Sequence, residues 1–470
     1  MKKFFMLLFT AASLIICVIP FAGMTFFASN EVIGNEEREE LPQLVSEDGV
    51  QHDYLSRLGS WFEQSFAFRP QIISADAEIQ SRVFGVSNLD SVVTGSGDWL
   101  FYSSSLNDHL GKNPLSMRSI KNIARNLRLT QDYVSAQGAE FIFTVAPNKN
   151  TLYPEKMPYY YSVKCSPARN TDFLGSELAL AKVNYCDLFA AFKNEDEILY
   201  LKQDSHWNNK GAMLAYNAIL DSLGKQHNDY AAAEAVREKT FFGDLGKMLY
   251  PATARPEYNY EYDIHASYSY VTPTKSVEEA VIKTANPAAE GSLYMYRDSF
   301  GNALLPYFAN AYGSAYFTKA FPVNLAADMG ANKPDTVAIE LAERNIDWLE
   351  SMPPVFAAPE VTDHAVSGQA DGNGSITAKI SDVNMQLVEI SGAIDSSLCR
   401  DDTEILVELS DRSGRQRLYR AFCFGADDGE GFLAYVPAAD HSGQLKASVV
   451  TADGENYTRV LTEDISISTT

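Results

Sequence analysis

Two short polar stretches hold the residue types that acyl transfer requires. In "KQDSHWNNKGAMLAYNAIL", Asp204 and His206 lie two residues apart, so in an extended chain both side chains point the same way and the carboxylate can hold the Nδ1 proton of the imidazole. In "RDSFGNALLPYFANAYG", Ser299 precedes Gly301 at a predicted strand-to-helix turn, where amide groups can stabilise an oxyanion. Together they predict a serine nucleophile, a general base and an orienting acid.

Each of these residues also has a plainer interpretation. Ser299 can simply cap the helix that follows it, and Asp204 can close an Asx turn that leaves His206 on the surface. Asp263 and His265 repeat the same spacing within the tyrosine-rich stretch "EYNYEYDIHASYSYV", which is typical of a meander or a surface insertion. The sequence has no H-x-x-x-H or C-x-x-C spacing and no Walker or dinucleotide-binding glycine pattern, so it predicts no metal and no cofactor.

Alternating helices and continuous apolar strands must position these residues. Strands are predicted at 140–147, 292–296 and 335–340, and helices at 116–137, 210–223 and 301–312. This alternation predicts an α/β domain with a parallel sheet, in which sites form beyond the carboxyl ends of strands. A Pro/Gly/Ser-rich linker at 352–374 then precedes short alternating segments at 375–470, which predict a small all-β sandwich.

The N-terminus predicts a membrane location. After Lys2 and Lys3, the run from Phe4 to Ala28 carries no charge and, at ~1.5 Å per residue, is long enough for the ~30 Å hydrocarbon core. Residues 1–30 are therefore expected to be an uncleaved anchor with the rest of the chain outside, a cleaved signal peptide being the alternative. Residues 31–53 predict an acidic stalk. The formal net charge of -23 excludes nucleic acid as an expected partner.

The cysteines fit an extracytoplasmic chain. Cys165 and Cys186 lie in one half and Cys399 and Cys423 in the other, so one local disulfide in each domain is a hypothesis. Four cysteines allow three pairings, and four buried free thiols are the alternative.

The chain also resembles a known family. "DSHWNNKGA" and "RDSFGNALLPYFANAY" are similar to the paired signatures of the AlgX/AlgJ-like proteins of polysaccharide O-acetylation, including the related DHHW group, within the SGNH-hydrolase superfamily. The resemblance extends to "SWFEQSFAFRP", "GSGDWLFYSS", "APNKNTLYPEKMP" and "IELAERNIDWL", in the order that the family shows. It covers roughly residues 50–350 and implies an SGNH-hydrolase-like three-layer sandwich across the predicted domain of residues 54–351.

The resemblance implies roles for single residues. Ser299 matches the family nucleophile, His206 the base and Asp204 the orienting acid, in the chain order Asp, His, Ser. Two positions depart from the pattern. Arg297 replaces the glycine of G-D-S and is expected to affect the rim or the oxyanion geometry, and Ser205 replaces the first histidine of D-H-H-W.

Further residues at strand ends are candidate contacts. The Ser299 backbone N–H and Asn148 are expected oxyanion donors, and Lys149 and Arg344 are expected to bind a sugar or a carboxylate. Loop capping or a salt bridge is the alternative for each of these side chains.

The sequence thus predicts a membrane-anchored extracytoplasmic enzyme that moves an acetyl group through an acyl-serine onto a cell-envelope or exopolysaccharide glycan. The resemblance implies a multi-pass membrane-bound O-acyltransferase as the partner that supplies the acetyl donor. An acetyl esterase with the same residues, and a non-catalytic glycan-binding or export scaffold, are the alternatives.

Overall fold

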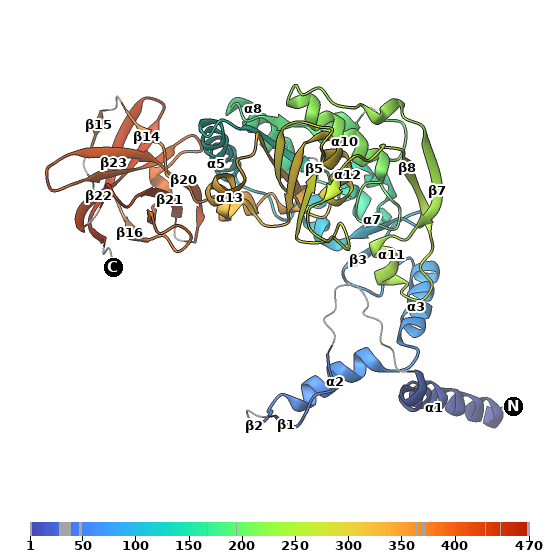
Figure 1. Ribbon diagram of the computed structural model, residues 1–470. Helices are drawn as coiled ribbons and strands as arrows, with labels where there is room; N and C mark the ends of the chain where they lie inside the picture. The colour runs from blue at the N-terminus through green and yellow to red at the C-terminus, as the bar shows by residue number, and fades with distance from the viewer. Residues whose placement is uncertain are drawn as a thin grey trace.

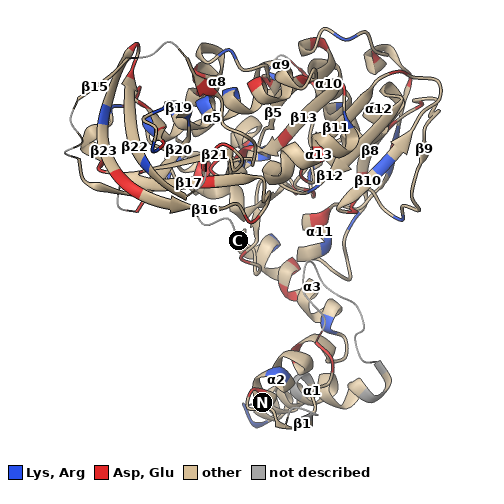
Figure 2. Cartoon of the chain, turned by 60° about the vertical axis from the view of Figure 1, so that its left-hand side comes forward, with Lys and Arg blue, Asp and Glu red and all other residues tan. Residues whose placement is uncertain are grey.

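A computed structural model describes residues 2–27, 39–46, 49–166, 168–193, 195–362, 365–368, 370, 372–427, 429–441 and 443–467. Figure 1 shows a β domain at one end of the molecule, an α/β domain beside it, and an N-terminal arm of helices α1 and α2 that joins the α/β domain through α3. Acidic and basic residues are spread over both domains (Figure 2).

A seven-stranded sheet forms the centre of the α/β domain. Its order is β6-β5-β13-β11-β12-β10-β9. The strands are β5 (Glu140–Ala146), β6 (Tyr185–Cys186), β9 (Ser269–Tyr270), β10 (Val281–Ala285), β11 (Ser292–Tyr296), β12 (Ser314–Thr318) and β13 (Thr336–Ala342). The five strands from β6 to β12 are parallel. Three of them, β5, β11 and β13, are the predicted parallel strands, whereas β6 and β12 were not predicted. The sheet as a whole is mixed, however, because β10 pairs antiparallel with both β12 and β9.

Helices cover both faces of this sheet. On one face lie α9 (Leu188–Phe192), α10 (Asn209–Ser222) and α12 (Gly301–Ala311), and on the other lie α5 (Met117–Ala136), α8 (Asn170–Leu180), α13 (Leu325–Asn332) and α14 (Trp348–Ser351). In α5, the apolar residues at helical spacing are buried against the sheet, and Ser116 caps the helix by accepting a hydrogen bond from the Ser119 amide. The result is the expected three-layer arrangement.

Short elements surround the carboxyl edge of the sheet. They are β3 (Val92–Thr94), β4 (Leu100–Tyr102), α4 (Leu106–His109), α6 (Lys149–Leu152), α7 (Tyr159–Ser162), β7 (Ala235–Phe241), α11 (Asp244–Leu249) and β8 (Glu257–Tyr262). Two antiparallel hairpins, β3 with β4 and β7 with β8, flank the loop that precedes α10.

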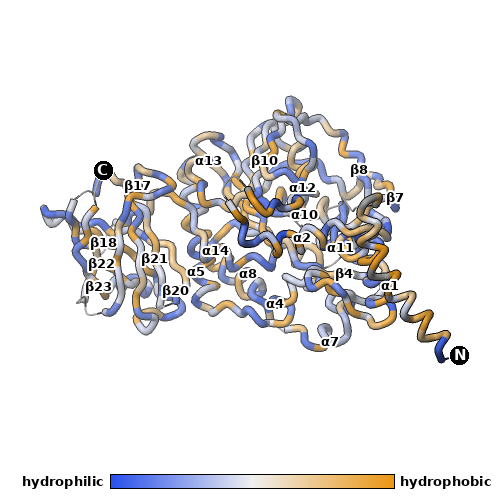
Figure 3. The backbone as a smooth tube through the Cα atoms, turned by 90° about the horizontal axis from the view of Figure 1, so that it is seen from below, coloured by the Kyte–Doolittle hydropathy of each residue, from blue (hydrophilic) through white to orange (hydrophobic). Residues whose placement is uncertain are grey.

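The N-terminal arm begins with one long apolar helix, α1 (Lys2–Phe27), in which Lys2–Met24 is long and apolar enough to cross a membrane. Figure 3 shows α1 as predominantly hydrophobic. Its end packs on the segment between α2 (Tyr54–Ser65) and α3 (Arg69–Ile79), since the Ala67 amide donates to the Pro20 carbonyl at 3.1 Å. A small hairpin of β1 (Val45–Ser46) and β2 (Gly49–Val50) precedes α2. The predicted stalk lies partly outside the described residues.

The C-terminal domain is a sandwich of two sheets. One has the order β14-β19-β18-β22-β23-β15 and the other β16-β17-β21-β20. The strands are β14 (Glu360–Val361), β15 (Val366–Ser367), β16 (Gly374–Ile380), β17 (Leu387–Ile394), β18 (Glu404–Ser410), β19 (Gln416–Arg420), β20 (Phe422–Ala426), β21 (Gly429–Pro437), β22 (Gly443–Asp453) and β23 (Asn456–Ile467). All their pairings are antiparallel except that of β15 with β23. Because β14 and β15 lie within the predicted linker, that segment is partly folded into the sandwich.

The sandwich packs directly on α5. Asn126 of α5 exchanges two hydrogen bonds with the Cys423 backbone, at 3.0 and 3.1 Å, and Arg118 donates to the Thr403 carbonyl at 2.9 Å and pairs with Glu430 at 2.6 Å. Phe422 and Tyr435 of the sandwich belong to the same apolar cluster as the α5 face. The two domains therefore share one continuous core.

The hypothesis of one disulfide in each domain is not supported. Cys165, Cys186, Cys399 and Cys423 are all free thiols in the structure. Cys186 is buried on β6 within the core of the α/β domain, whereas Cys165 is exposed in a loop, so these two side chains occupy different environments. Cys399 and Cys423 both contact the sandwich core as thiols, and burial raises the pKa of each to about 11.

Candidate active site

The turn after β11 presents Ser299 at the carboxyl edge of the sheet, one residue before Phe300, which is buried. Asp298 secures this turn, because its carboxylate accepts hydrogen bonds from the Phe300 amide at 2.8 Å and from the Ala342 amide at 2.7 Å. Gly301 is required immediately afterwards, since a Cβ there would lie 2.6 Å from Cβ of Arg297. The sequence around Ser299 thus folds into a tight turn tied to the neighbouring strand β13.

The loop before α10 presents His206. Asn208 caps α10 by accepting a hydrogen bond from the Gly211 amide at 2.9 Å, and buried Trp207 forms a β-bridge with Tyr200 that closes the loop. The His206 ring packs edge-on to the Phe300 ring, with centroids 4.8 Å apart. Phe300 therefore supports the imidazole from the same turn that carries Ser299.

Asp204, His206 and Ser299 form a continuous chain of hydrogen bonds. His206 Nε2 lies 2.8 Å from Ser299 Oγ, and His206 Nδ1 lies 2.7 Å from Asp204 Oδ1. The same Asp204 oxygen accepts the His206 backbone amide at 2.9 Å. Because an ionised carboxylate only accepts hydrogen bonds, Asp204 places the ring proton on Nδ1 and leaves the Nε2 lone pair facing the serine.

Burial and hydrogen bonding oppose each other in this pair. Burial raises the pKa of Asp204, but the hydrogen bond and the charge of His206 outweigh it and bring the pKa to about 2. Burial likewise lowers the pKa of His206, and the hydrogen bond and charge of Asp204 hold it above its ordinary value of 6.5. The carboxylate is thus ionised at neutral pH and favours an imidazole that can take up a proton.

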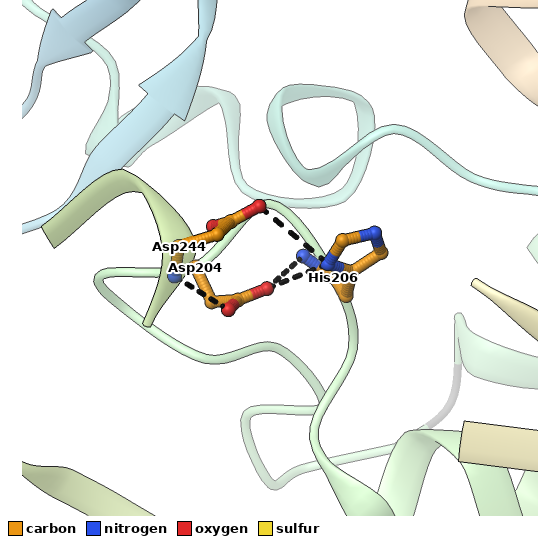
Figure 4. Close-up of side chains that lie close together, drawn as sticks. All are labelled: Asp204, His206 and Asp244. Atoms are coloured by element: carbon orange, nitrogen blue, oxygen red, sulfur yellow. Dashed lines mark hydrogen bonds and ion pairs between the residues drawn. The ribbon is translucent and has the colours of Figure 1, made fainter. Parts of the chain in front are cut away.

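Asp244, at the start of α11, completes the surroundings of Asp204. Its amide donates to Asp204 Oδ2 at 2.8 Å, and its own carboxylate accepts from the Ser205 amide at 2.8 Å and from Ser205 Oγ at 2.6 Å. Figure 4 shows Asp204 and Asp244 on the same side of the His206 ring, with Asp244 Oδ2 3.8 Å from Nδ1. Sequence reasoning missed Asp244, because "GDLGKML" carries no motif and lies forty residues beyond Asp204 in the chain.

Lys149 does not line the site, contrary to the expectation of a substrate contact. It is 4% exposed, and its ammonium donates to the carbonyls of Leu100, Lys202 and Asp204 at 2.7, 2.7 and 2.8 Å. It also lies 5.0 Å from the centroid of the Trp99 ring. Burial lowers the pKa of Lys149 to about 7, although the negative charges of nearby carboxylates act to raise it. Lys149 instead holds the backbone of Asp204 against that of Leu100 and Lys202.

Asn148 makes its contacts outside the hydrogen-bond chain of Asp204, His206 and Ser299. Asn148 is buried. Its backbone amide donates to Glu343 Oε2 at 2.7 Å, and its side-chain Nδ2 donates to Asp108 Oδ2 at 3.4 Å. Its predicted role as an oxyanion donor is therefore wrong. Burial raises the pKa of Glu343 to about 8, so this neighbouring cluster holds carboxyl groups that are protonated more readily than usual.

Arg297 was expected at the rim of the site and is instead buried, with 3% exposure. Its guanidinium donates to Asn302 and to the carbonyls of Val277 and Glu279, the latter two at 2.9 and 3.2 Å. Arg297 therefore ties the Ser299 turn to the segment before β10. It acts on the shape of the turn and is not among the described residues that line the cavity of Ser299.

Ser299 and His206 open into a cavity of about 1460 Å³. Its aromatic lining comprises Tyr102, Trp207, Phe241, Phe242, Tyr262, Phe300 and Tyr307. Arg344 also lines it, with its guanidinium 5.6 and 5.7 Å from the centroids of Tyr102 and Phe300. Of the four predicted substrate or oxyanion side chains, Arg344 is thus the one that the structure brings to the cavity. Aromatic rings interspersed with polar and charged side chains suit a sugar or a small acyl donor.

The rival pair, Asp263 and His265, makes the same local contact in a different setting. Asp263 Oδ1 lies 3.1 Å from His265 Nδ1 and accepts the His265 amide at 3.0 Å. Both side chains are largely exposed, at 73% and 87%. Within the described part of the chain, no serine hydroxyl bonds to the His265 ring, so this pair lacks the third member that Ser299 provides for His206.

Asp204, His206 and Asp244 also form a group whose potential metal-ligand atoms lie within 4.8 Å of one another. Hydrogen-bond donors already occupy these atoms, however. Asp204 Oδ1 receives the Nδ1 proton of His206, and Asp244 Oδ2 receives the Ser205 hydroxyl. The arrangement therefore fits an oriented imidazole better than a metal centre.

Comparison with known proteins bears on the fold that surrounds this site. Residues 92–289 match the family model of the SGNH hydrolase-like domain, acetyltransferase AlgX. No curated protein matches the chain. Asp204 and His206 lie inside the matched region, and Ser299 lies ten residues beyond its end.

Several solved structures are similar to this chain. PatB1 of Bacillus cereus has 18% sequence identity and a TM-score of 0.43, over 54% of this chain and 96% of its own. A DHHW family protein of Eubacterium siraeum has 15% identity and a TM-score of 0.43, over 56% of this chain and 96% of its own. The O-acetyltransferase domain of Pseudomonas putida AlgJ has 18% identity and a TM-score of 0.38, over 55% of this chain and 92% of its own. Through residues 92–289, the chain is thus similar to the SGNH hydrolase-like domain of acetyltransferase AlgX.

Proposed function

We propose that this protein is an extracytoplasmic O-acetyltransferase, which carries an acetyl group on Ser299 and transfers it to a hydroxyl of a cell-envelope or exopolysaccharide glycan. The observation that carries the proposal is the hydrogen-bond chain from Asp204 through His206 to Ser299 at the mouth of a large cavity. The match to the AlgX acetyltransferase domain supports acetyl transfer as the reaction class.

The first half of the reaction forms the acyl-enzyme. Ser299 Oγ attacks the carbonyl carbon of the acetyl donor while His206 Nε2 removes the hydroxyl proton. The Ser299 backbone N–H, which makes no hydrogen bond within the described part of the chain, is the proposed oxyanion donor. The tetrahedral intermediate then expels the donor's leaving group, which takes the proton from His206. Asp204 stabilises the imidazolium between these two proton transfers.

The second half passes the acetyl group to the glycan. A sugar hydroxyl attacks the acetyl-Ser299 carbonyl, His206 Nε2 takes the hydroxyl proton, and the proton returns to Ser299 Oγ as the ester to the enzyme breaks. Arg344 is the proposed contact for a sugar or carboxylate oxygen, because its guanidinium stacks on two rings of the cavity wall with no ion pair among the described residues.

Helix α1 is the proposed membrane anchor, with Lys2 and Lys3 on the cytoplasmic side and both folded domains outside. A cleaved signal peptide would leave the same domains outside but unanchored. By resemblance, a multi-pass membrane-bound O-acyltransferase is the proposed source of the acetyl donor. An anchored chain would hold the Ser299 cavity near such a partner.

The decisive experiment uses the full-length protein in detergent with a chromogenic acetyl ester, with and without an acetyl-free oligosaccharide. Mass spectrometry then locates acetyl groups on Ser299 and on the sugar. Acetylated sugar that disappears in Ser299→Ala is the expected result. Ester cleavage without acetylated sugar across a panel of glycans would indicate an esterase, and the absence of any acetyl-enzyme would indicate a binding or scaffold protein.

A further inference from the structure

A second cavity, of about 930 Å³, adjoins the one that contains Ser299. The two share the lining residues Glu261, Tyr262 and Ile264, which lie at and just after the end of β8. The second cavity contains no residue of the hydrogen-bond chain from Asp204 to Ser299. It is therefore distinct from the reacting groups of the proposed chemistry.

Helix α12 connects the two cavities. Ala303, Pro306 and Tyr307 of this helix line the first cavity, as does Ser299 two residues before it, and Asn310 near its end lines the second. Ala303, Tyr307 and Asn310 follow one another at intervals of four and three residues, so they lie on one face of the helix. From 299 to 310 the chain advances roughly 16 Å at the helical rise. This length exceeds a single sugar ring and suits several linked ones.

The rim of the second cavity is built from satisfied polar side chains. Asn310 Nδ2 donates to the Tyr230 hydroxyl and to the Ile264 carbonyl, both at 3.0 Å, and Asn310 Oδ1 accepts from the Ser267 amide at 2.9 Å. Asn286 Nδ2 donates to the Asn310 carbonyl at 2.7 Å. These bonds fix the rim to α12, and hence to the helix that begins beside Ser299.

The lining chemistry indicates the ligand. Glu234, Glu261 and Asp263 supply carboxylates and His265 an imidazole, whereas no lysine or arginine is among the described residues that line this cavity. Carboxylate oxygens accept hydrogen bonds from sugar hydroxyls, and tyrosine rings offer flat apolar faces for sugar rings. Three carboxylates together would repel a polyanion. The cavity therefore suits a hydroxyl-rich saccharide without acidic groups.

We propose that this second cavity is a subsite for the acceptor glycan, so that a chain of uncharged or amino-bearing sugars runs along α12 with its reacting hydroxyl at Ser299. The proposal rests on the proposed function, since the subsite serves the glycan that receives the acetyl group. It adds that the acceptor is an oligomer of at least about three sugars, as the helical length requires. It also adds that the part of the acceptor in the second cavity carries no acidic groups.

The test measures binding, which needs no acetyl transfer. Calorimetry on full-length Ser299→Ala in detergent compares neutral cello-oligosaccharides and N-acetylchito-oligosaccharides, and acidic oligogalacturonides, each from one to six sugars. Ala288→Trp blocks the subsite, because Ala288 lines the second cavity and is exposed. Ala327→Trp is the matched control, because Ala327 is exposed on α13, which packs on the opposite face of the sheet.

The expected result is an affinity for at least one neutral series that rises about tenfold or more from one sugar to three or more, a gain that Ala288→Trp removes and Ala327→Trp retains. Three outcomes would overturn the proposal: no gain with length in either neutral series, a gain that survives Ala288→Trp, or tighter binding of the acidic series. If oligosaccharides bind as expected but acetylated sugar never forms, the proposed reaction fails while the subsite stands.

Discussion

Replacing Asp204 by asparagine tests the hydrogen-bond chain most directly, because three N–H groups converge on the two carboxylate oxygens. Oδ1 accepts from the ring and the backbone of His206, and Oδ2 accepts from the Asp244 amide. An asparagine offers one oxygen and one NH₂ group. Whichever way it is turned, the NH₂ group faces an N–H donor.

Both orientations of the substituted amide weaken the site. If its NH₂ group faces His206, the ring must accept at Nδ1, so its proton moves to Nε2 and the nitrogen facing Ser299 can no longer remove a proton. If its oxygen faces His206, the NH₂ group opposes the Asp244 amide and the imidazolium loses its ionised partner. We expect kcat/KM for acetyl-ester cleavage to fall by at least ~10³, as in other serine triads.

The same substitution has a pH-dependent effect on stability. The pKa of Asp204 in the folded chain is about 2, below the ordinary value of 3.8, and the gap corresponds to about 2 kcal/mol. Because the folded pKa is depressed, this stability is fully present above pH 3.8 and is lost as the pH falls through about 2. Asp204→Asn should therefore lower the free energy of unfolding by about 2 kcal/mol at pH 7, and by much less near pH 2.

The assay combines ester cleavage with urea unfolding at several pH values. Asp187→Asn is the control, since Asp187 caps α9 by accepting the Ala190 amide at 3.0 Å and asparagine is an equally good cap. An Asp204→Asn enzyme that keeps more than a tenth of wild-type kcat/KM, while Ser299→Ala is inactive, would refute the orienting role of Asp204. A loss of stability that does not shrink toward acid pH would refute the ionised carboxylate.

Three further predictions follow from the same contacts. Because Asp204 holds the pKa of His206 above 6.5, kcat/KM should decline as the pH falls through a value above 6.5, and a decline centred below 6.5 in a pH profile would contradict this assignment. Lys149→Met leaves three carbonyls without their ammonium partner, so it should lower the free energy of unfolding by about 1–3 kcal/mol and lower kcat with little change in KM. The control, Lys247→Met on the cavity wall, should leave the free energy of unfolding unchanged in urea titrations. Since all four described cysteines outside α1 are thiols, dithiothreitol should leave the melting temperature unchanged, and a drop of several degrees would reveal a disulfide.

Sequence patterns predicted the parts of the site that depend on local chemistry. The buried strand before Ser299, the glycine after it and the Asp-x-His spacing all act within a few residues, and the structure brings Asp204, His206 and Ser299 together as expected. Three of the five parallel strands, β5, β11 and β13, and the β sandwich were equally visible, because their apolar residues form clear runs or alternate regularly. The short strand β9 was not, because it lies in the tyrosine-rich segment, which gives no clear period, and the five-residue strand β10 beyond that segment was also missed.

The incorrect expectations concern side chains whose direction the sequence does not encode. Lys149 and Arg297 follow strands β5 and β11, where charged residues usually face a substrate, yet both point inward to backbone carbonyls. A buried lysine or arginine is uncommon, and only the packing of distant loops supplies its partners. The same limit hid Asp244, and it applies to cysteine pairs, whose separation in space does not follow from their spacing in the chain.

The packing of the β sandwich on α5 has a mechanical consequence. An interface that shares an apolar core and holds Arg118 and Asn126 in buried hydrogen bonds cannot hinge without exposing these groups to water. We therefore expect the two domains to move together as one rigid body. A force applied to the sandwich, by a polymer under tension or by a neighbouring protein, would reach the sheet beneath Ser299 through α5 rather than dissipate in the connecting segment.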